Sequence, residues 1–174
     1  NLFLDIFQRL VKSDAFCMEY KQKVRRRILD YYAEHVFGED LDLVATDDPE
    51  LLREHLKRGG MAVANVTGDR PEDSHVGLFS HGGHYVAVVG IEEDGETVIV
   101  LDPSQLPDKF HEEGREGKVI ENGCILRTSL ATLAEDCKYR DMEHYPEGEF
   151  KAWMQFAQKE SHDRYYLFGL KGEE

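Results

Sequence analysis

Apolar side chains recur every three or four residues over the first third of the chain, a spacing that puts them on one face of a helix. One such stripe covers residues 2–11, and a longer one covers residues 16–36. The longer stripe shares its segment with the basic cluster "KQKVRRR" (residues 21–27), which is more typical of a solvated helix face than of a docking patch. The pattern predicts two amphipathic helices at the start of the chain.

A third helix is predicted in "TDDPELLREHLKRGG" (residues 46–60), because both of its ends carry the usual signals. Asp48 is placed to cap the first turn, Pro49 fits within that turn, and the Gly59–Gly60 pair ends the helix. The acidic run "GEDLDLVATDD" (residues 38–48) lacks the glycine and the terminal glutamate of a calcium loop. Its carboxylates are therefore expected in turns and caps.

Beyond this helix the apolar period shortens from four residues to two, which is typical of strands. Strands are expected at residues 61–66, 84–91, 97–101, 124–128 and 164–170, helices at 129–137 (capped by Ser129) and around 150–157, and a polar loop at 103–123. A chain of 174 residues fits one domain with a real core. We expect a single α+β domain over residues 1–174, with N-terminal helices packed on a central antiparallel sheet.

The stretch "SHGGHYVAVVGIEEDGETVIVLDPS" (residues 80–104) predicts a hairpin with a histidine at one end and an aspartate at the other. A turn at Asp94–Gly95 places His84 opposite Asp102 or its neighbour. Opposed Cβ atoms lie roughly 5 Å apart, so we expect a hydrogen bond between the two side chains. Such a pair is either part of an active site or a structural hydrogen bond at the edge of a sheet. Gly82–Gly83 are expected to let another backbone approach closely.

The charge balance narrows the choice of partners. The 35 acidic and 21 basic side chains give a formal charge of −14, which repels phosphate backbones and anionic lipid headgroups. No apolar run approaches the roughly 20 residues of a spanning helix, and the first residues carry no export pattern. We expect no contact with nucleic acid or membrane, no cofactor, and a soluble chain, either cytoplasmic or exported after removal of an upstream signal.

A metal site built from His75, His81 and His84 is an alternative use of the histidines. Their spacings of six and three residues do not suit a strand, in which alternate residues share a face, and no carboxylate or cysteine completes the set at typical ligand spacing. The three cysteines of the chain form no C-x-x-C pair, so neither a thiolate zinc site nor a disulfide framework is indicated. We therefore expect no metal and a reduced compartment.

The helix, strand and hairpin together carry a resemblance to a known family. "LLREHLKRGGMAVANV", "GGHYVAVVG" and "VIVLDPS" follow one another in an order that resembles the papain-like cysteine peptidases of the bacteriocin-leader-processing type. In that family a histidine opens one strand after a Gly-rich approach, and an aspartate followed by proline closes the next. The resemblance covers residues 28–104 well. It implies that His84 is the general base and acid and that Asp102 orients it.

The chain departs from that family at the nucleophile. The family's cysteine begins an early helix in a Cys-Gly-Pro-like context, with a glutamine a few residues before it. Cys17, in "AFCMEY", follows Gln8 but lacks this context, while Cys124 and Cys137 come after the histidine and aspartate. We therefore expect no cysteine of this chain within bonding reach of His84. The nucleophile is expected in a segment upstream of residue 1.

Two functions follow from the resemblance. The first is a papain-like cysteine hydrolase that cleaves a peptide or a small amide through a Cys-His-Asp arrangement. The second is a catalytically inactive papain-like domain that binds a peptide or protein partner. The polar segment "PSQLPDKFHEEGREG" (residues 103–117) leaves the sheet beside Asp102. It is expected to be either a mobile flap over substrate or an ordinary surface insertion.

Overall fold

A computed structural model describes residues 41–104, 106, 108–139, 147–148, 151–152 and 164–170. The helices predicted over residues 2–11 and 16–36 lie outside these residues, as do Cys17 and nearly all of the helix predicted around residues 150–157. Within the described part, the chain forms a mixed α and β fold in which helices pack against an antiparallel sheet.

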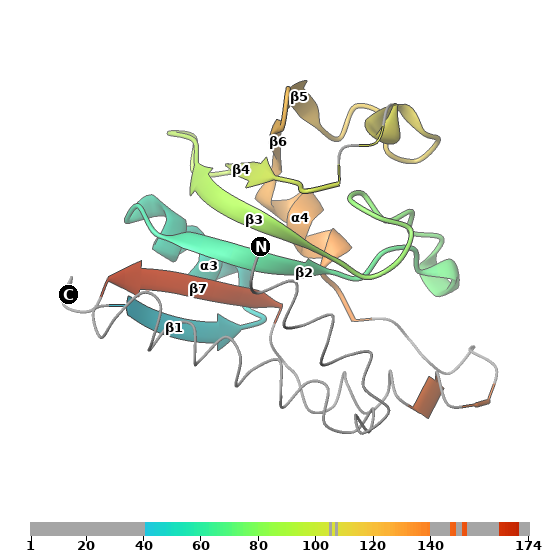
Figure 1. Ribbon diagram of the computed structural model, residues 1–174, viewed down its shortest axis with the longest axis horizontal. Coiled ribbons are helices and arrows are strands. Elements are labelled where there is room, and N and C mark those ends of the chain that lie inside the picture. The colour runs from blue at the N-terminus through green and yellow to red at the C-terminus, as the bar shows by residue number, and fades with distance from the viewer. Residues whose placement is uncertain are drawn as a thin grey trace.

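Seven strands form one sheet in the described part of the chain, in the order β1-β7-β2-β3-β4-β6-β5, and all neighbouring strands are antiparallel. The strands are β1 (Leu41–Thr46), β2 (Met61–Val66), β3 (His84–Ile91), β4 (Thr97–Leu101), β5 (Ile120–Asn122), β6 (Ile125–Ser129) and β7 (Tyr165–Leu170). Figure 1 shows β2 and β3 in the middle of the sheet. The predicted strands β2, β3, β4, β6 and β7 are confirmed to within a residue.

Two α-helices lie on the same face of the sheet, behind it in Figure 1: α3 (Pro49–Lys57) and α4 (Leu130–Asp136). As predicted, the side chains of Asp48 and Ser129 cap them by accepting hydrogen bonds from backbone N–H groups of the first turn. Two short 3-10 turns, η2 (Pro71–Asp73) and η3 (Lys109–His111), complete the described elements. None of the described helices has the length and apolarity needed to span a membrane.

The hydrophobic core lies between the sheet and these two helices. On β3 and β4, alternate residues point into it, and each is at most 1% exposed: Val86, Val88, Val98 and Val100. Leu52 of α3 and Leu133 of α4 are both 0% exposed and belong to the same cluster. Complete burial of a valine or leucine contributes roughly 1.5–3 kcal/mol, so this face of the central hairpin is strongly fixed.

The β3–β4 hairpin has the predicted strands in a shifted register. Val88 pairs with Val100, whereas the predicted register placed it opposite Val98. Next to the turn, Ile91 pairs with Val98, three residues beyond its predicted partner, because the turn is closed by Asp94 Oδ1, which accepts hydrogen bonds from two later N–H groups at 2.8 Å each. A bulge between Val88 and Gly90 then reduces the shift by one residue. The shift amounts to two residues, so each side chain keeps the face that the sequence predicted.

The two edge strands were not predicted. β1 lies within the acidic run of residues 38–48, whose carboxylates were expected only in turns and caps. β5 lies at the end of the predicted polar loop, and its three residues are all exposed. A strand of three exposed residues, such as β5, is too short to show the alternation on which strand prediction depends.

Candidate functional site

His84 and Asp102 meet at one rim of the sheet. His84 is the first residue of β3, and Asp102 directly follows Leu101, the last residue of β4. The imidazole Nε2 and the carboxylate Oδ1 are 2.9 Å apart, which confirms the predicted hydrogen bond. Since the paired positions are diagonal rather than directly opposite, the long imidazole bridges the offset.

The environment of this pair favours an ionised aspartate. The Asp102 side chain is 0% exposed, and that of His84 is 23% exposed. Burial acts to raise the pKa of Asp102, but hydrogen bonds from His84, Lys109 and Ser104 N outweigh it and hold the pKa below its usual range. The carboxylate therefore accepts a hydrogen bond from Nε2–H, and in the neutral ring this tautomer has its lone pair on Nδ1. No described residue hydrogen-bonds to Nδ1.

Lys109 is a third member of this cluster that sequence reasoning missed. Its Nζ donates to Asp102 Oδ2 at 2.5 Å and lies 3.4 Å from the carbonyl oxygen of Ser104. Its side chain is only 3% exposed. The one available signal was Phe110, an apolar residue in a polar segment, which marks a point where the loop returns to the core.

The loop that follows Asp102 is anchored to the loop that precedes His84, and both lie at the right-hand end of the sheet in Figure 1. The rings of Phe79 and Phe110 meet edge to face with centroids 6.2 Å apart. Arg115, 2% exposed, donates from Nε to the carbonyl oxygen of Gly77 at 2.7 Å. For the described residues of segment 103–117, such buried contacts favour an ordinary surface insertion over a mobile flap.

The backbone of Gly82 does come close to another segment, at Gly68, but it is Gly68 and not Gly82 or Gly83 that has no room for a side chain. A Cβ atom on Gly82 would meet no described atom within 4 Å, and one on Gly83 would meet only Val66 O at 4.0 Å. At Gly68, by contrast, a Cβ atom would lie 2.4 Å from Gly82 O, and at Gly77 it would lie 2.1 Å from a carbonyl oxygen. The glycines next to His84 thus border open, exposed space.

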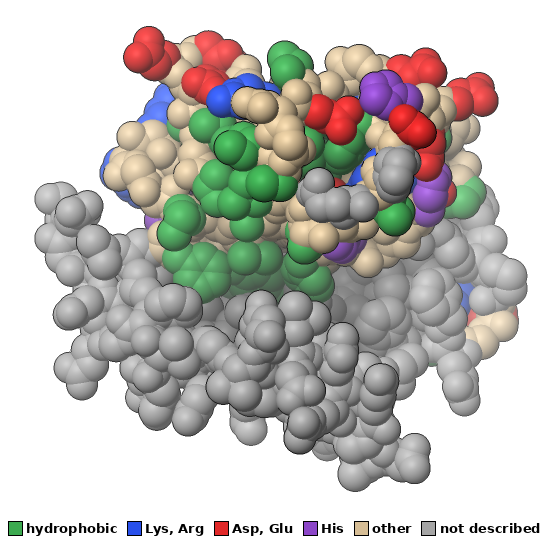
Figure 2. Space-filling view, turned by 45° about the horizontal axis from the view of Figure 1, so that its top comes forward, with side chains coloured by type: hydrophobic (Ala, Val, Ile, Leu, Met, Phe, Trp, Pro, Cys, Tyr) green, Lys and Arg blue, Asp and Glu red, His purple; other side chains and the backbone are tan. Residues whose placement is uncertain are grey.

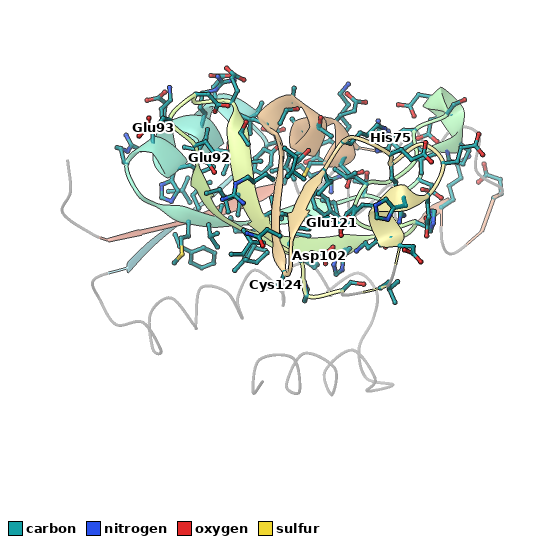
Figure 3. All side chains as sticks on the ribbon, turned by 90° about the horizontal axis from the view of Figure 1, so that it is seen from above. His75, Glu92, Glu93, Asp102, Glu121 and Cys124 are labelled. Carbon is teal, nitrogen blue, oxygen red and sulfur yellow. The ribbon has the colours of Figure 1, made fainter. Side chains whose placement is uncertain are left out.

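The histidines considered for a metal site do not converge. His75 Nε2 lies 2.8 Å from Asp136 Oδ1. His81 lies between two other carboxylates: its Nδ1 is 2.9 Å from Asp69 Oδ2, and its Nε2 is 2.9 Å from Glu112 Oε2. Figure 3 shows His75 well separated from Asp102, and Figure 2 shows histidines among acidic side chains at the right-hand end of the molecule. Within the described residues, no group of three or more potential ligands is arranged to hold a metal ion.

Cys124 lies beside Asp102, on the side that faces away from β3 and His84. It occupies the tight turn between β5 and β6, and the pairing of Leu101 with Ile125 brings this turn next to Asp102 (Figure 3). β4 separates it from β3, and two strand spacings amount to about 10 Å. No hydrogen bond links the exposed Cys124 thiol to His84 in the described structure.

Cys137 is a core residue. It is 1% exposed, and burial together with the neighbouring Asp136 carboxylate raises the pKa of its thiol far above the usual range. A thiol in this state is a poor nucleophile. Neither of the two described cysteines hydrogen-bonds to His84, and Cys17 lies outside the described residues.

At this rim of the sheet, the Nε2–H group of His84 is held by the buried Asp102 carboxylate, and Nδ1 is in a position to accept a proton. This is the arrangement of a general base. No family model, no curated protein and no solved structure matches the chain.

Proposed function

We propose that this chain carries the histidine and aspartate of a cysteine hydrolase that cleaves a peptide or small amide bond. The observation that carries the proposal is the 2.9 Å hydrogen bond between His84 Nε2 and the buried Asp102, with Nδ1 unpartnered among the described residues. In a Cys-His-Asp arrangement the aspartate holds one ring nitrogen and the thiol faces the other.

A papain-like fold is part of the same proposal. It is supported by the resemblance in sequence and by the order of α3, β2 and the β3–β4 hairpin, in which the histidine opens one strand and the aspartate closes its neighbour. The exposed Gly82–Gly83 approach gives a substrate backbone room to lie beside His84.

The proposed reaction needs a cysteine from outside the described residues. Its thiol gives a proton to Nδ1 of His84, and the thiolate attacks the carbonyl carbon of the amide. The imidazolium returns that proton to the amine as the C–N bond breaks, which leaves a thioester. Water then attacks the thioester, His84 takes the proton of the water, and the released thiolate recovers it.

Labelling of the full-length protein with a peptidyl electrophile tests this function. We expect one covalent adduct per chain on a single cysteine, identified by mass spectrometry, and loss of the adduct in His84→Ala. Cys17→Ser and Cys124→Ser serve as matched controls. Adduct formation that persists in a folded His84→Ala variant would exclude His84 as the base. Labelling of Cys17 that depends on His84 would contradict only the expectation of an upstream nucleophile.

An inactive domain that binds a peptide or protein partner is the second candidate. It is favoured by one observation, namely that neither described cysteine hydrogen-bonds to His84. Under this alternative the full-length protein forms no adduct at any cysteine in a His84-dependent manner. Peptide binding instead changes the backbone amide resonances of Gly82 and Gly83, and the change persists in His84→Ala.

A further inference from the structure

Asp102 is the centre of a chain of three side chains rather than of a pair. Its Oδ1 accepts from His84 Nε2 at 2.9 Å and from Ser104 N at 2.8 Å, and its Oδ2 accepts from Lys109 Nζ at 2.5 Å. The two oxygens therefore face different partners, with the base on one side and a fixed ammonium group on the other.

Because both side chains are buried, the Lys109 ammonium group has a strong electrostatic effect on the Asp102 carboxylate. The side chains of Asp102 and Lys109 are 0% and 3% exposed, so water screens their charges only weakly. A buried carboxylate needs a compensating cation, because an isolated buried charge is strongly unfavourable. The Lys109 ammonium group, bonded to Asp102 Oδ2, is placed to supply that cation. His84 is thus free to exist as the neutral imidazole while Asp102 stays ionised.

The surroundings hold Lys109 in this place. The Lys109 ammonium lies 5.4 Å from the ring centroid of Phe110, which packs on Phe79. Arg115 donates from Nη1 to the Lys109 carbonyl oxygen at 3.2 Å and pairs with Glu112 at 3.0 Å. The side chain is therefore delivered to Asp102 by an anchored turn and not by chance contact of a mobile lysine.

We propose that Lys109 is a positioning residue that acts through Asp102: it balances the charge of the carboxylate so that His84 is not trapped as the imidazolium, and it binds Oδ2 while the ring binds Oδ1. The catalytic meaning of this assignment rests on the proposed function. The electrostatic assignment itself concerns only His84, Asp102 and Lys109. Both His84 and Lys109 are described residues that hydrogen-bond directly to the Asp102 carboxylate.

The test is a pH titration of the His84 ring by ¹⁵N NMR in the full chain, from about pH 4 to pH 9, a range chosen to bracket imidazole titration. In Lys109→Met, Asp102 loses its buried ammonium partner while His84 stays hydrogen-bonded to it, so the imidazolium is expected to persist to a higher pH by at least about half a unit. Lys109→Arg retains the charge and is expected to titrate as the native chain does. Lys109→Gln keeps a hydrogen-bond donor without charge and serves if the methionine variant does not fold.

The outcomes separate this inference from the proposed function. An unchanged His84 midpoint in a folded Lys109→Met or Lys109→Gln variant would reduce Lys109 to a packing residue and overturn the proposal. The same holds if Lys109→Arg shifts the midpoint as far as Lys109→Met does. The titration needs no turnover, so it stands even where electrophile labelling shows no hydrolase. Where labelling is present, its pH profile moves in Lys109→Met, whereas a purely structural loss lowers the rate equally at every pH.

Discussion

His84 and Asp102 carry different parts of the proposed reaction, and substitution separates them. His84 moves the proton, so His84→Ala is expected to abolish turnover of the full-length protein. Asp102 only orients the ring and stabilises the imidazolium, so Asp102→Asn is expected to leave residual activity, with a loss on the order of 10- to 10⁴-fold. The measurement is kcat/KM for hydrolysis of a fluorogenic peptide amide.

Thermal melts must accompany these kinetics. A buried polar pair that loses one partner costs roughly 1–3 kcal/mol of stability, and a partly unfolded variant imitates a catalytic defect. Residual activity that is larger in a folded His84→Ala than in Asp102→Asn would reverse the assigned roles. Lys109→Arg is a useful control, because it keeps the charge pattern around Asp102 intact.

The residues of this cluster were not equally visible in the sequence. His84 and Asp102 stand at the two ends of an alternating hairpin, so strand periodicity alone brings them together. Lys109 reaches Asp102 through a loop whose path depends on the packing of Phe110 against Phe79. No local periodicity encodes a contact of that kind, and a lysine in a polar segment is ordinarily solvated.

At the scale of elements, the hairpin shows why faces are more predictable than registers. The alternation of apolar residues fixed which side chains point into the core, and the structure agrees. The pairing of Val88 with Val100 differs from the prediction because Asp94 closes a later turn than expected, and the bulge in β3 then reduces the shift from three residues to two. A shift of two residues preserves the face and therefore preserves the meeting of His84 with Asp102.

A second carboxylate, Asp136 at the end of α4, holds the loop that leads to His84. Its side chain is 0% exposed, accepts from Leu78 N at 2.7 Å and from Phe79 N at 3.4 Å, and lies 2.8 Å from His75 Nε2. These backbone groups are buried, so the carboxylate is their hydrogen-bond partner in place of water. α4 thereby fixes the position of the Gly-rich approach to β3.

Removal of this anchor is expected to destabilise the domain. Asp136→Ala leaves buried backbone N–H groups without an acceptor, and we expect a loss of about 3 kcal/mol in the free energy of unfolding, measured by urea denaturation. Glu93→Ala, on the exposed hairpin turn, is the matched control and should change stability by no more than about 0.5 kcal/mol. A loss in Asp136→Ala as small as that of the control would show that the loop is held elsewhere.

For the whole molecule, charge decides how stability depends on pH. A formal charge of −14 means that the folded chain repels itself at neutral pH, and moderate acid relieves this repulsion. Protonation acts in the opposite sense at several paired carboxylates. Hydrogen bonds and ion pairs lower the pKa of Asp102, Asp73 and Glu135, in each case against the opposing effect of burial.

These lowered pKa values predict that the free energy of unfolding decreases in acid. In the unfolded chain the carboxyl groups take up protons near their ordinary pKa values of about 4, whereas in the folded chain they do so only at lower pH. The unfolded state therefore binds more protons in this interval, and the free energy of unfolding falls as the pH drops below about 4. Urea denaturation at a series of pH values measures the slope. Asp102→Asn should show a shallower slope, because one of the contributing groups is gone.

The free energy of unfolding is also expected to decrease in alkali, because some buried groups have raised rather than lowered pKa values. Burial raises the pKa of the Cys137 thiol and of the Tyr165 phenol, so the folded chain keeps these protons when the unfolded chain has released them. The free energy of unfolding should accordingly fall again above about pH 8.5, where a free thiol ionises. Cys137→Ala removes the lower-pH part of this loss and moves its onset toward the tyrosine range near pH 10. An onset that stays at the same pH in a folded Cys137→Ala variant would assign the alkaline loss to general self-repulsion. Added salt distinguishes the two, because it screens repulsion between exposed charges and leaves a buried thiol unaffected.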